Sequence, residues 1–330
     1  MLASVQTISN GLEAKNPYLL RVTKSPSNRT RTLLKPLVSV IVPVLNVSST
    51  IDELMDALNR QTYPDESTEI IIVDNGSTDN TVEKVREHDV ILLTEHSVKS
   101  PYAARNRGFE KAGGTIFALT DANKIPDKNW IENGIKALSN SNADIAGGNI
   151  LFDLGENPTT AEIYDSVMFN NNENLVHNEG GSAAGNLFFK REVLNEIGPF
   201  PENFRSGMDI WWTQKAVNKG FKLVYAYEAV VFCKPRKLKA VLKKSYRVGK
   251  THPFNLYQSG KSVSYIIGMI IRTFAPPRIR QVNHQIEKTG LSVSFTRFWG
   301  ISWLSKICLG FGRIKGLAEL NGKLEDRRKK

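Results

Sequence analysis

Two apolar runs decide the fold of this chain: VSVIVPVLN at residues 38–46 and EIIIVDNGSTDNT at residues 69–81. Each contains consecutive β-branched residues, the pattern of a strand buried on both faces of a sheet, and each ends in polar residues. The segment between them, SSTIDELMDALNRQ at residues 48–61, spaces its apolar residues at helical intervals. A strand, a helix and a second strand in this order predict a parallel βαβ unit.

The same alternation continues along the chain. Strands separated by helices form a mostly parallel sheet, so we expect an α/β fold with a mixed, mostly parallel, Rossmann-like sheet flanked by helices. The further helices are predicted over residues 78–87, 101–112, 130–139, 161–170 and 209–219, and the further strands over residues 90–93, 115–121, 144–152, 221–227 and 229–232.

Polar residues follow three of the predicted strands. Asn46 follows the first strand, Asp74 opens the turn after the second, and Asp121 and Asn123 follow the strand that ends near residue 120. Because the carboxyl ends of parallel strands meet at one edge of a sheet, a ligand site is expected there. Asp74 is placed to accept hydrogen bonds from a base or a ribose. The alternative is that Asp74 and Ser77 only shape the strand-to-helix turn.

Composition sets the broad class. The 330 residues are 41% apolar and 23% charged, which excludes a disordered chain. The formal net charge of +11 favours anionic partners, namely nucleic acid, anionic lipid or phosphorylated small molecules. Cys233 and Cys308 lie far apart, so we expect no disulfide. With no signal-peptide pattern and no apolar run of ~18 residues, a cytoplasmic protein is expected, soluble or peripheral at the membrane.

The chain divides into three parts. Residues 1–35 are polar and lack periodicity, so we expect a loosely ordered extension. Residues 36–234 hold the α/β domain, and residues 235–330 are expected to form basic amphipathic helices. The segment KPRKLKAVLKKSYRVGK at residues 234–250 is dense in lysine and arginine. Two interpretations stay open: helices that lie on an anionic membrane surface, and helices that pack on the α/β domain.

Four short motifs occur in a fixed order. They are VPVLN at residues 42–46, DNGSTD at 74–79, ARNRG at 104–108 and TDAN at 120–123. Together they resemble the family 2 glycosyltransferases of the GT-A fold, and the likeness extends over about residues 37–233. Each motif alone is weak, whereas the ordered set is specific. The resemblance implies the nucleotide-diphospho-sugar transferase fold, with a helical C-terminal extension.

The resemblance also implies a nucleotide-sugar site, carried over position by position. Asp209 stands where the family has the acid that serves as catalytic base. Asp121 and Asn123 stand where the family has the two acids of an Asp-x-Asp motif, the second of which ligates a metal. The residues matched to nucleotide-sugar contacts are Pro43, Asn46, Asp74, Arg105 and Asp121.

Sugar transfer with inversion is one in-line displacement. It needs a base on the acceptor hydroxyl and positive charge at the departing diphosphate, which a divalent cation, Mg²⁺ or Mn²⁺, usually supplies. Three positions depart from the family pattern: Asn123 replaces an acid, Met208 replaces Glu or Gly, and Cys233 replaces a His. An amide oxygen is a weaker ligand than a carboxylate, so a weakly bound cation is expected.

The implied function is an inverting glycosyltransferase of surface or extracellular polysaccharide synthesis. The donor would be a nucleoside-diphosphate sugar, with a UDP-sugar as first candidate, and the acceptor a glycan or a lipid-linked glycan. The alternative is a catalytically silent relative that binds a nucleotide or glycan, against which the retention of Asp74, Arg105 and Asp209 argues. Nucleic acid is not expected as a partner, because no recognition motif is present. Motif matching does not identify the sugar.

Overall fold

The computed structural model describes residues 35–169, 171–204 and 206–328, so the expected extension over residues 1–35 lies, except for Lys35, outside the described residues. Within these ranges, eight strands form one sheet in the order β3-β2-β1-β4-β7-β6-β8-β5. The strands are β1 (Val38–Val44), β2 (Thr68–Asp74), β3 (Ile91–Thr94), β4 (Ile116–Thr120), β5 (Lys124–Pro126), β6 (Ile145–Phe152), β7 (Asn186–Lys190) and β8 (Leu223–Cys233).

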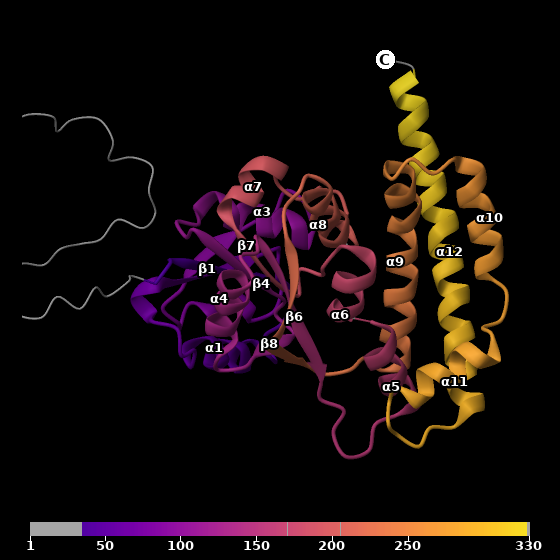
Figure 1. The fold of residues 1–330 in the computed structure, drawn as a ribbon, viewed down its shortest axis with the longest axis horizontal. Coiled ribbons are helices and arrows are strands. Elements are labelled where there is room, and N and C mark those ends of the chain that lie inside the picture. Colours follow the sequence, from indigo (N-terminus) through magenta and orange to yellow (C-terminus); the bar gives the residue numbers. More distant parts are fainter. Residues whose placement is uncertain (1–34, 170, 205, 329–330) are drawn as a thin grey trace, which may run out of the picture.

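Helices connect and flank these strands, and the last four follow the sheet (Figure 1). The helices are α1 (Ile51–Asn59), α2 (Thr81–Val85), α3 (Pro101–Lys111), α4 (Trp130–Asn140), α5 (Thr160–Met168), α6 (Asn172–Asn174), α7 (Arg191–Ile197), α8 (Met208–Asn218), α9 (Leu238–Gln258), α10 (Val263–Thr273), α11 (Ile279–Glu287) and α12 (Phe295–Arg328).

The sheet is mixed. Strand β1 pairs in parallel with β2 and β4, and β2 pairs in parallel with β3, as the alternation of strands and helices predicts. Strand β7 runs antiparallel between β4 and β6, and β5 runs antiparallel to β8 at the edge. Strands β6 and β8 are parallel neighbours. The prediction of a mixed, mostly parallel sheet flanked by helices is confirmed.

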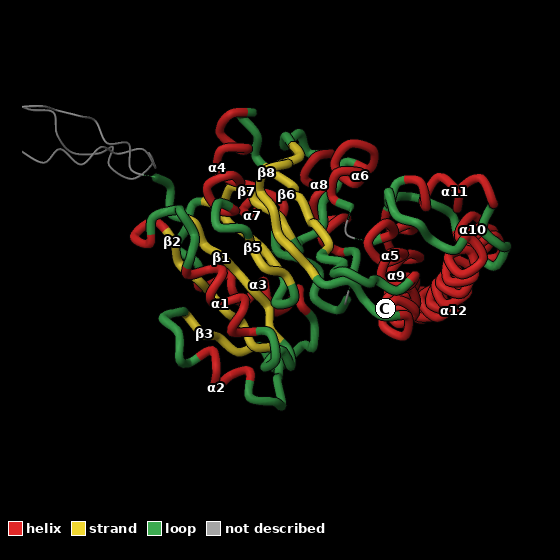
Figure 2. The backbone as a smooth tube through the Cα atoms, turned by 90° about the horizontal axis from the view of Figure 1, so that it is seen from below, coloured by secondary structure: helices red, strands yellow, loops and turns green. Residues whose placement is uncertain are grey.

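Helices cover both faces of the sheet (Figure 2). Helices α1 and α4 pack on the face that carries Val40 and Val42, and helices α3, α7 and α8 pack on the face that carries Ile41. Successive side chains of a strand point to opposite faces. Because all three residues are 0% exposed, β1 is apolar at consecutive positions rather than at alternate ones.

Helices α9 to α12 form a bundle beside the α/β part, next to α5 (Figures 1 and 2). Glycines let α9 and α12 approach closely. A Cβ atom on Gly312 would lie 2.1 Å from the carbonyl oxygen of Tyr246, and one on Gly316 would lie 2.1 Å from that of Lys250. None of the described helices combines the length and the apolar character needed to cross a bilayer.

Three local predictions differ from the structure. Helix α2 is shorter than predicted because Thr78 binds Asn46 instead: its backbone N–H donates to Asn46 Oδ1 over 2.8 Å. The two strands predicted over residues 221–232 are one strand, β8, whose pairing with β6 shifts register between Gly148 and Asn149. Strand β5 was not predicted, because three residues are too few to show a periodic pattern.

Candidate active site

A cavity of about 970 Å³ lies between the α/β part and the helical bundle. Its lining comes from the start of α3, the turn between β4 and β5, the loop before β7, the start of α8, and helices α9, α10 and α12. Four of the residues predicted from the sequence line this cavity: Arg105, Asp121, Asn123 and Asp209. The structure therefore brings together the predicted base and the predicted diphosphate residues.

Asp121 is held between two cations. Arg105 donates from Nη2 to Asp121 Oδ1 over 2.5 Å, and Lys124 donates from Nζ to Asp121 Oδ2. Both cationic side chains are almost fully buried, at 3% and 2% exposed, whereas 36% of the Asp121 side chain is exposed. Burial opposes ionisation, but Lys124 and Arg105 outweigh it and hold the pKa of Asp121 well below its ordinary value. Asp121 is therefore ionised at neutral pH.

Asp209 is fixed at the second residue of α8. Its Oδ1 accepts from the Tyr102 hydroxyl over 2.9 Å, and its Oδ2 accepts from the backbone N–H of Ala184 over 2.8 Å. The Tyr102 hydroxyl accepts in turn from the N–H of Met208. Burial raises the pKa of Tyr102 well above its ordinary value, and Asp209 raises it further, so Tyr102 remains a donor. The carboxylate is thus oriented by two donors and lies at the positive end of the helix dipole.

The turn before α8 requires glycine. Gly207 precedes the helix with a φ of 81°, a backbone conformation that residues with a side chain rarely adopt. Its carbonyl oxygen accepts from Asn255 Nδ2 of α9 over 3.3 Å, and Phe204 stacks on Phe254 of α9 with ring centroids 4.5 Å apart. Helix α9 is therefore attached to the segment that presents Asp209.

The other three predicted residues lie at the ends of β1 and β2, outside the lining of this cavity. Asn46 accepts from the N–H of Thr78, and its own N–H donates to Ser77 Oγ over 3.0 Å. Asp74, 2% exposed, accepts from the N–H groups of Gly76 and Ser77, each over 3.1 Å. These bonds are those of a turn, the alternative that the sequence left open. Nucleotide contacts of Asp74, Asn46 and Pro43 stay predictions.

The cavity carries more positive than negative residues. Three acidic residues line it, namely Asp121, Glu179 and Asp209. Six lysine and arginine side chains line it, namely Arg105, Lys124, Arg236, Lys244, Arg247 and Arg313. Four of the six lie at or beyond residue 236, in the part that the sequence assigned to a separate basic region. An anionic ligand such as a diphosphate suits this lining.

Five of the six basic residues that line the cavity, and Tyr102, were not among the site residues predicted from the sequence. Lys124 directly follows Asn123, and this place beside the Asp-x-Asp position is the one feature of the sequence that could have indicated it. Arg236 and Lys244 belong to the basic run, which gives no indication of the direction in which each side chain points. Arg236 is held by Asp165, which is 0% exposed, through an ion pair of 3.2 Å. Burial and then Arg236 lower the pKa of Lys244 well below its ordinary value.

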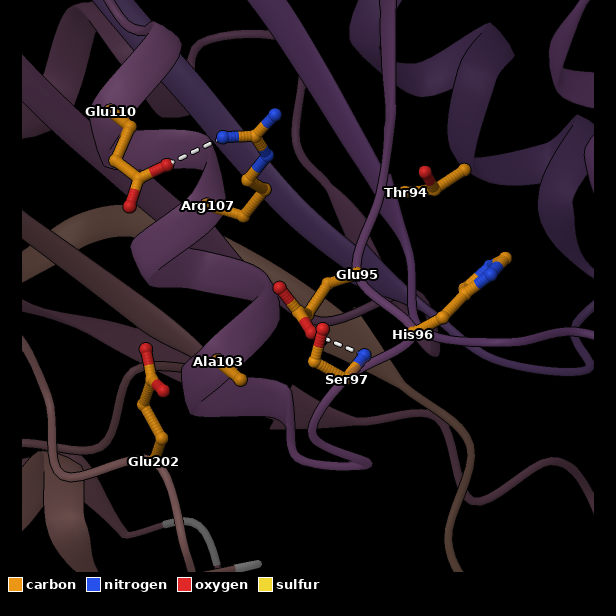
Figure 3. Close-up of a pocket in the computed structure, with 8 residues that line it drawn as sticks. All are labelled: Thr94, Glu95, His96, Ser97, Ala103, Arg107, Glu110 and Glu202. Atoms are coloured by element: carbon orange, nitrogen blue, oxygen red, sulfur yellow. Dashed lines mark hydrogen bonds and ion pairs between the residues drawn. The ribbon is translucent and has the colours of Figure 1, made fainter.

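A second pocket, of about 430 Å³, lies beside the end of β3 and the outer side of α3. Figure 3 shows that its lining is acidic: Glu95, Glu110 and Glu202 surround it. Arg107 pairs with Glu110 over 2.7 Å, and Glu95 accepts from the N–H of Ser97 over 2.7 Å. Three carboxylates against one arginine disfavour a diphosphate, so the larger cavity is the candidate site.

Comparison with known proteins identifies the family. The family model described as Glycosyl transferase family 2 matches residues 39–198. Glycosyltransferase AglE of Haloferax volcanii is 32% identical over 291 residues, which cover 84% of this chain and 95% of AglE. The chain belongs to glycosyltransferase family 2. The resemblance drawn from the motifs is confirmed, and the chain is a glycosyltransferase.

The chain is also similar to other glycosyltransferases in sequence and in fold. A Methanococcus voltae protein is named a dolichyl N-acetyl-alpha-D-glucosaminyl phosphate 3-beta-D-2,3-diacetamido-2,3-dideoxy-beta-D-glucuronosyltransferase. It is 25% identical over 204 residues, 56% of this chain and 63% of that one. Mannosyltransferase PcManGT from Pyrobaculum calidifontis, solved with GDP-Man and Mn²⁺, superimposes with a TM-score of 0.60 at 18% identity, over 91% of this chain and 90% of that one. S. aureus TarS 1–349 with UDP-GlcNAc has a TM-score of 0.50 at 18% identity, over 64% and 66%.

The residues at the Asp-x-Asp position of this family 2 chain do not form a usual divalent-metal site. Both oxygens of Asp121 are engaged by cations, and Asn123 is exposed and neutral. Cys233 is buried and pairs across the strands with Lys124, and a thiol is a soft ligand. Within the described ranges, no group of three or more His, Cys, Asp or Glu side chains is placed to hold a metal ion. Mg²⁺ and Mn²⁺ take several oxygen ligands, which this set does not supply.

Proposed function

We propose that this enzyme transfers a sugar from a nucleoside-diphosphate sugar to a hydroxyl of its acceptor, with inversion at the anomeric carbon. One observation carries the proposal: a carboxylate with two orienting donors, Asp209, lines the same positively charged cavity as the Asp121–Arg105–Lys124 cluster. A base and an anion site in one cavity are the two parts that a single displacement needs.

In this mechanism Asp209 accepts the proton of the acceptor hydroxyl. The hydroxyl oxygen forms a bond to the anomeric carbon while the bond from that carbon to the diphosphate oxygen breaks. The electron pair of the breaking bond stays on the nucleoside diphosphate, whose negative charge grows in the transition state. The donors from Tyr102 and Ala184 hold the carboxylate in one orientation, so its approach to the hydroxyl is preorganised.

The donor class is supported by the charge of the cavity and by two structural relatives, which hold UDP-GlcNAc and GDP-Man. A UDP-sugar remains the first candidate. The acceptor we propose is a glycan or a lipid-linked glycan, in synthesis of a surface or extracellular polysaccharide. The Methanococcus voltae relative, named for a dolichyl phosphate sugar, supports a lipid-linked acceptor.

We also propose that the bundle rests on an anionic membrane surface. The apolar residues that support this lie on α10 and α12 rather than in the basic run: Ile267, Ile271, Phe311 and Ile314 are between 44% and 68% exposed. Exposed basic residues, Arg272 and Lys315, neighbour them in sequence. Aliphatic and aromatic side chains interleaved with basic ones are typical of a helix surface at the headgroup level.

Liposome sedimentation tests the membrane part. Binding to vesicles with anionic lipid should exceed binding to neutral vesicles and should fall as salt rises, because headgroup attraction is screened. The variant Ile271→Glu, Phe311→Glu should bind less than wild type, with the polar-surface variant Asp89→Asn as control. Equal sedimentation with both kinds of vesicle would overturn the proposal.

Incubation of the purified chain with UDP- and GDP-sugars, with and without a glycolipid acceptor, tests the catalytic part. Release of the nucleoside diphosphate and a product of inverted anomeric configuration, followed by nuclear magnetic resonance, is the expected result. Nucleotide binding without release from any donor would favour the silent-relative alternative, and retention of configuration would overturn the single displacement.

A further inference from the structure

We propose that the ammonium group of Lys124 supplies the positive charge at the leaving diphosphate, so that sugar transfer by this chain does not require a divalent cation. The inference rests on the proposed function, because it needs a nucleoside diphosphate as leaving group. It concerns a residue next to the Asp-x-Asp position, at the first residue of β5, whose side chain lines the cavity.

The charge of the cluster is the first argument. Asp121 carries one negative charge, and Arg105 alone would neutralise it. A second buried cation, Lys124, leaves the cluster with an excess positive charge at the cavity wall. Burying an unpaired charge costs several kcal/mol, so an ion pair that served folding alone would need only one of the two cations. An anionic ligand in the cavity balances the excess.

The position of Lys124 is the second argument. A Cβ atom on Gly185 would lie 2.7 Å from Nζ and Cε of Lys124 and 2.9 Å from Asp121 Oδ2. The ion pair is thus packed against a backbone that has no side chain at this point. The backbone of Lys124 is held in the sheet by its antiparallel pairing with Cys233 of β8. The ammonium group is fixed in place before any ligand binds, which is what electrostatic stabilisation of a leaving group requires.

The hydrogen-bonding capacity of Lys124 is the third argument. An ammonium group has three N–H donors, and Asp121 Oδ2 accepts one of them. Among the described residues, no other acceptor takes the remaining two. They are available to oxygens of a diphosphate in the cavity, where charge-assisted bonds are strong. As the sugar–oxygen bond breaks, the electron pair stays on the diphosphate oxygen, and Lys124 stabilises it as a donor while keeping its proton.

The same geometry disfavours a metal at this point. A divalent cation bound to Asp121 Oδ2 would lie beside the ammonium group of Lys124, and the two like charges would repel. Lys250 of α9 pairs with Glu319 over 2.8 Å and does not line this cavity.

Calorimetric titration of the full chain with UDP and GDP, each with EDTA and with Mn²⁺, tests the proposal. The wild type should bind its preferred diphosphate with the same affinity in both conditions, and transfer should resist EDTA. Lys124→Met should weaken diphosphate binding by about 10- to 100-fold, the value of lost charge-assisted bonds, and should leave binding of uridine or guanosine unchanged. Lys124→Arg should recover part of the loss. Lys128→Met, at an exposed lysine just after β5 that does not line the cavity, is the matched control and should bind as wild type.

If Lys124 is purely structural, Lys124→Met should lower the free energy of unfolding and should change the affinities for the diphosphate and for the nucleoside alike. That outcome would overturn the proposal. The double variant Asn123→Asp, Lys124→Asp removes the ammonium group and adds two carboxylates, so its diphosphate binding should become dependent on Mn²⁺. Wild-type binding that is lost in EDTA and restored by Mn²⁺ overturns the Lys124 proposal alone, even if Lys124→Met does not fold. Absence of UDP and GDP binding in every condition overturns the proposed function together with it.

Discussion

The turns after β2 and β4 differ in what binds their acids. Asp74 and Asp121 follow buried parallel strands, and one sequence pattern predicts both. Asp74 accepts from the backbone N–H groups of its own turn, at Gly76 and Ser77, and its one side-chain partner among the described residues is the exposed ring of His96, at 3.4 Å. Asp121 accepts from the side chains of Arg105 and Lys124. Hydrogen bonds from backbone amides stabilise the turn itself. Two cationic partners around one carboxylate leave an excess positive charge that an anionic ligand can balance. The two acids therefore have different expected effects when they are changed.

The largest effect is expected on the cavity side. Asp209→Asn keeps the shape of the side chain and removes the base, so the transfer rate should fall by a factor on the order of 10² to 10⁴. Nucleotide binding should change little, because the cations around Asp121 remain. Steady-state transfer assays measure the fall, with Asp89→Asn on the surface as control. A variant that retains half of the wild-type turnover would remove Asp209 from the mechanism.

Asp121→Asn is expected to have the second-largest effect. It leaves Arg105 and Lys124 buried without their carboxylate, and an uncompensated buried charge destabilises strongly, here by about 3 kcal/mol. Urea unfolding in the absence of ligand measures this loss. Addition of the nucleoside diphosphate should recover part of it, because the ligand supplies the missing negative charge. A change within about 0.5 kcal/mol, the range of neutral surface substitutions, would contradict the interpretation of Asp121 as the counter-charge of two buried cations.

The third prediction concerns the bundle wall of the cavity. Burial and then Arg313 lower the pKa of His252 to about 4, below the ordinary value of ~6.5. The unfolded chain binds more protons between these values, so stability falls as the pH drops from ~6.5 towards 4, by up to about 3 kcal/mol. His252→Gln removes this titration. Unfolding curves of wild type and variant at several pH values should therefore converge on acidification, and parallel curves would contradict the assignment.

The smallest effect is expected at the turn after β2. Asp74→Asn weakens two hydrogen bonds to Gly76 and Ser77 without leaving a buried charge, so stability should fall by about 1 kcal/mol. Titration with uridine and guanosine then tests the base contact predicted from the family motif. Weaker nucleoside binding would confirm that prediction. Unchanged affinity would leave Asp74 as a residue of the turn and would sharpen its contrast with Asp121.

Sequence patterns predicted most of the elements because those patterns are local. The consecutive apolar residues of β1 and β2 and the helical spacing of α1 each depend on residues a few positions apart, and the structure has these elements at the predicted places. Short elements such as β5 were not predicted, since three residues are too few to show a periodic pattern. The composition of the basic run over residues 234–250 does not indicate where each side chain points, and in the structure Arg236, Lys244 and Arg247 line the cavity.

By itself, the sequence determined the alternation of strands and helices in the amino-terminal half, the family, and the positions of Asp121 and Asp209 at element ends. Only the tertiary structure decided the partners of these acids. Tyr102 donates to Asp209 across 107 positions of the chain, and Arg105 reaches Asp121 from a neighbouring helix. The placement of α9 against the start of α8 likewise adds distant cations to the cavity. Periodicity specifies which face a residue occupies, whereas a contact between distant segments depends on how whole elements pack, which no local pattern contains.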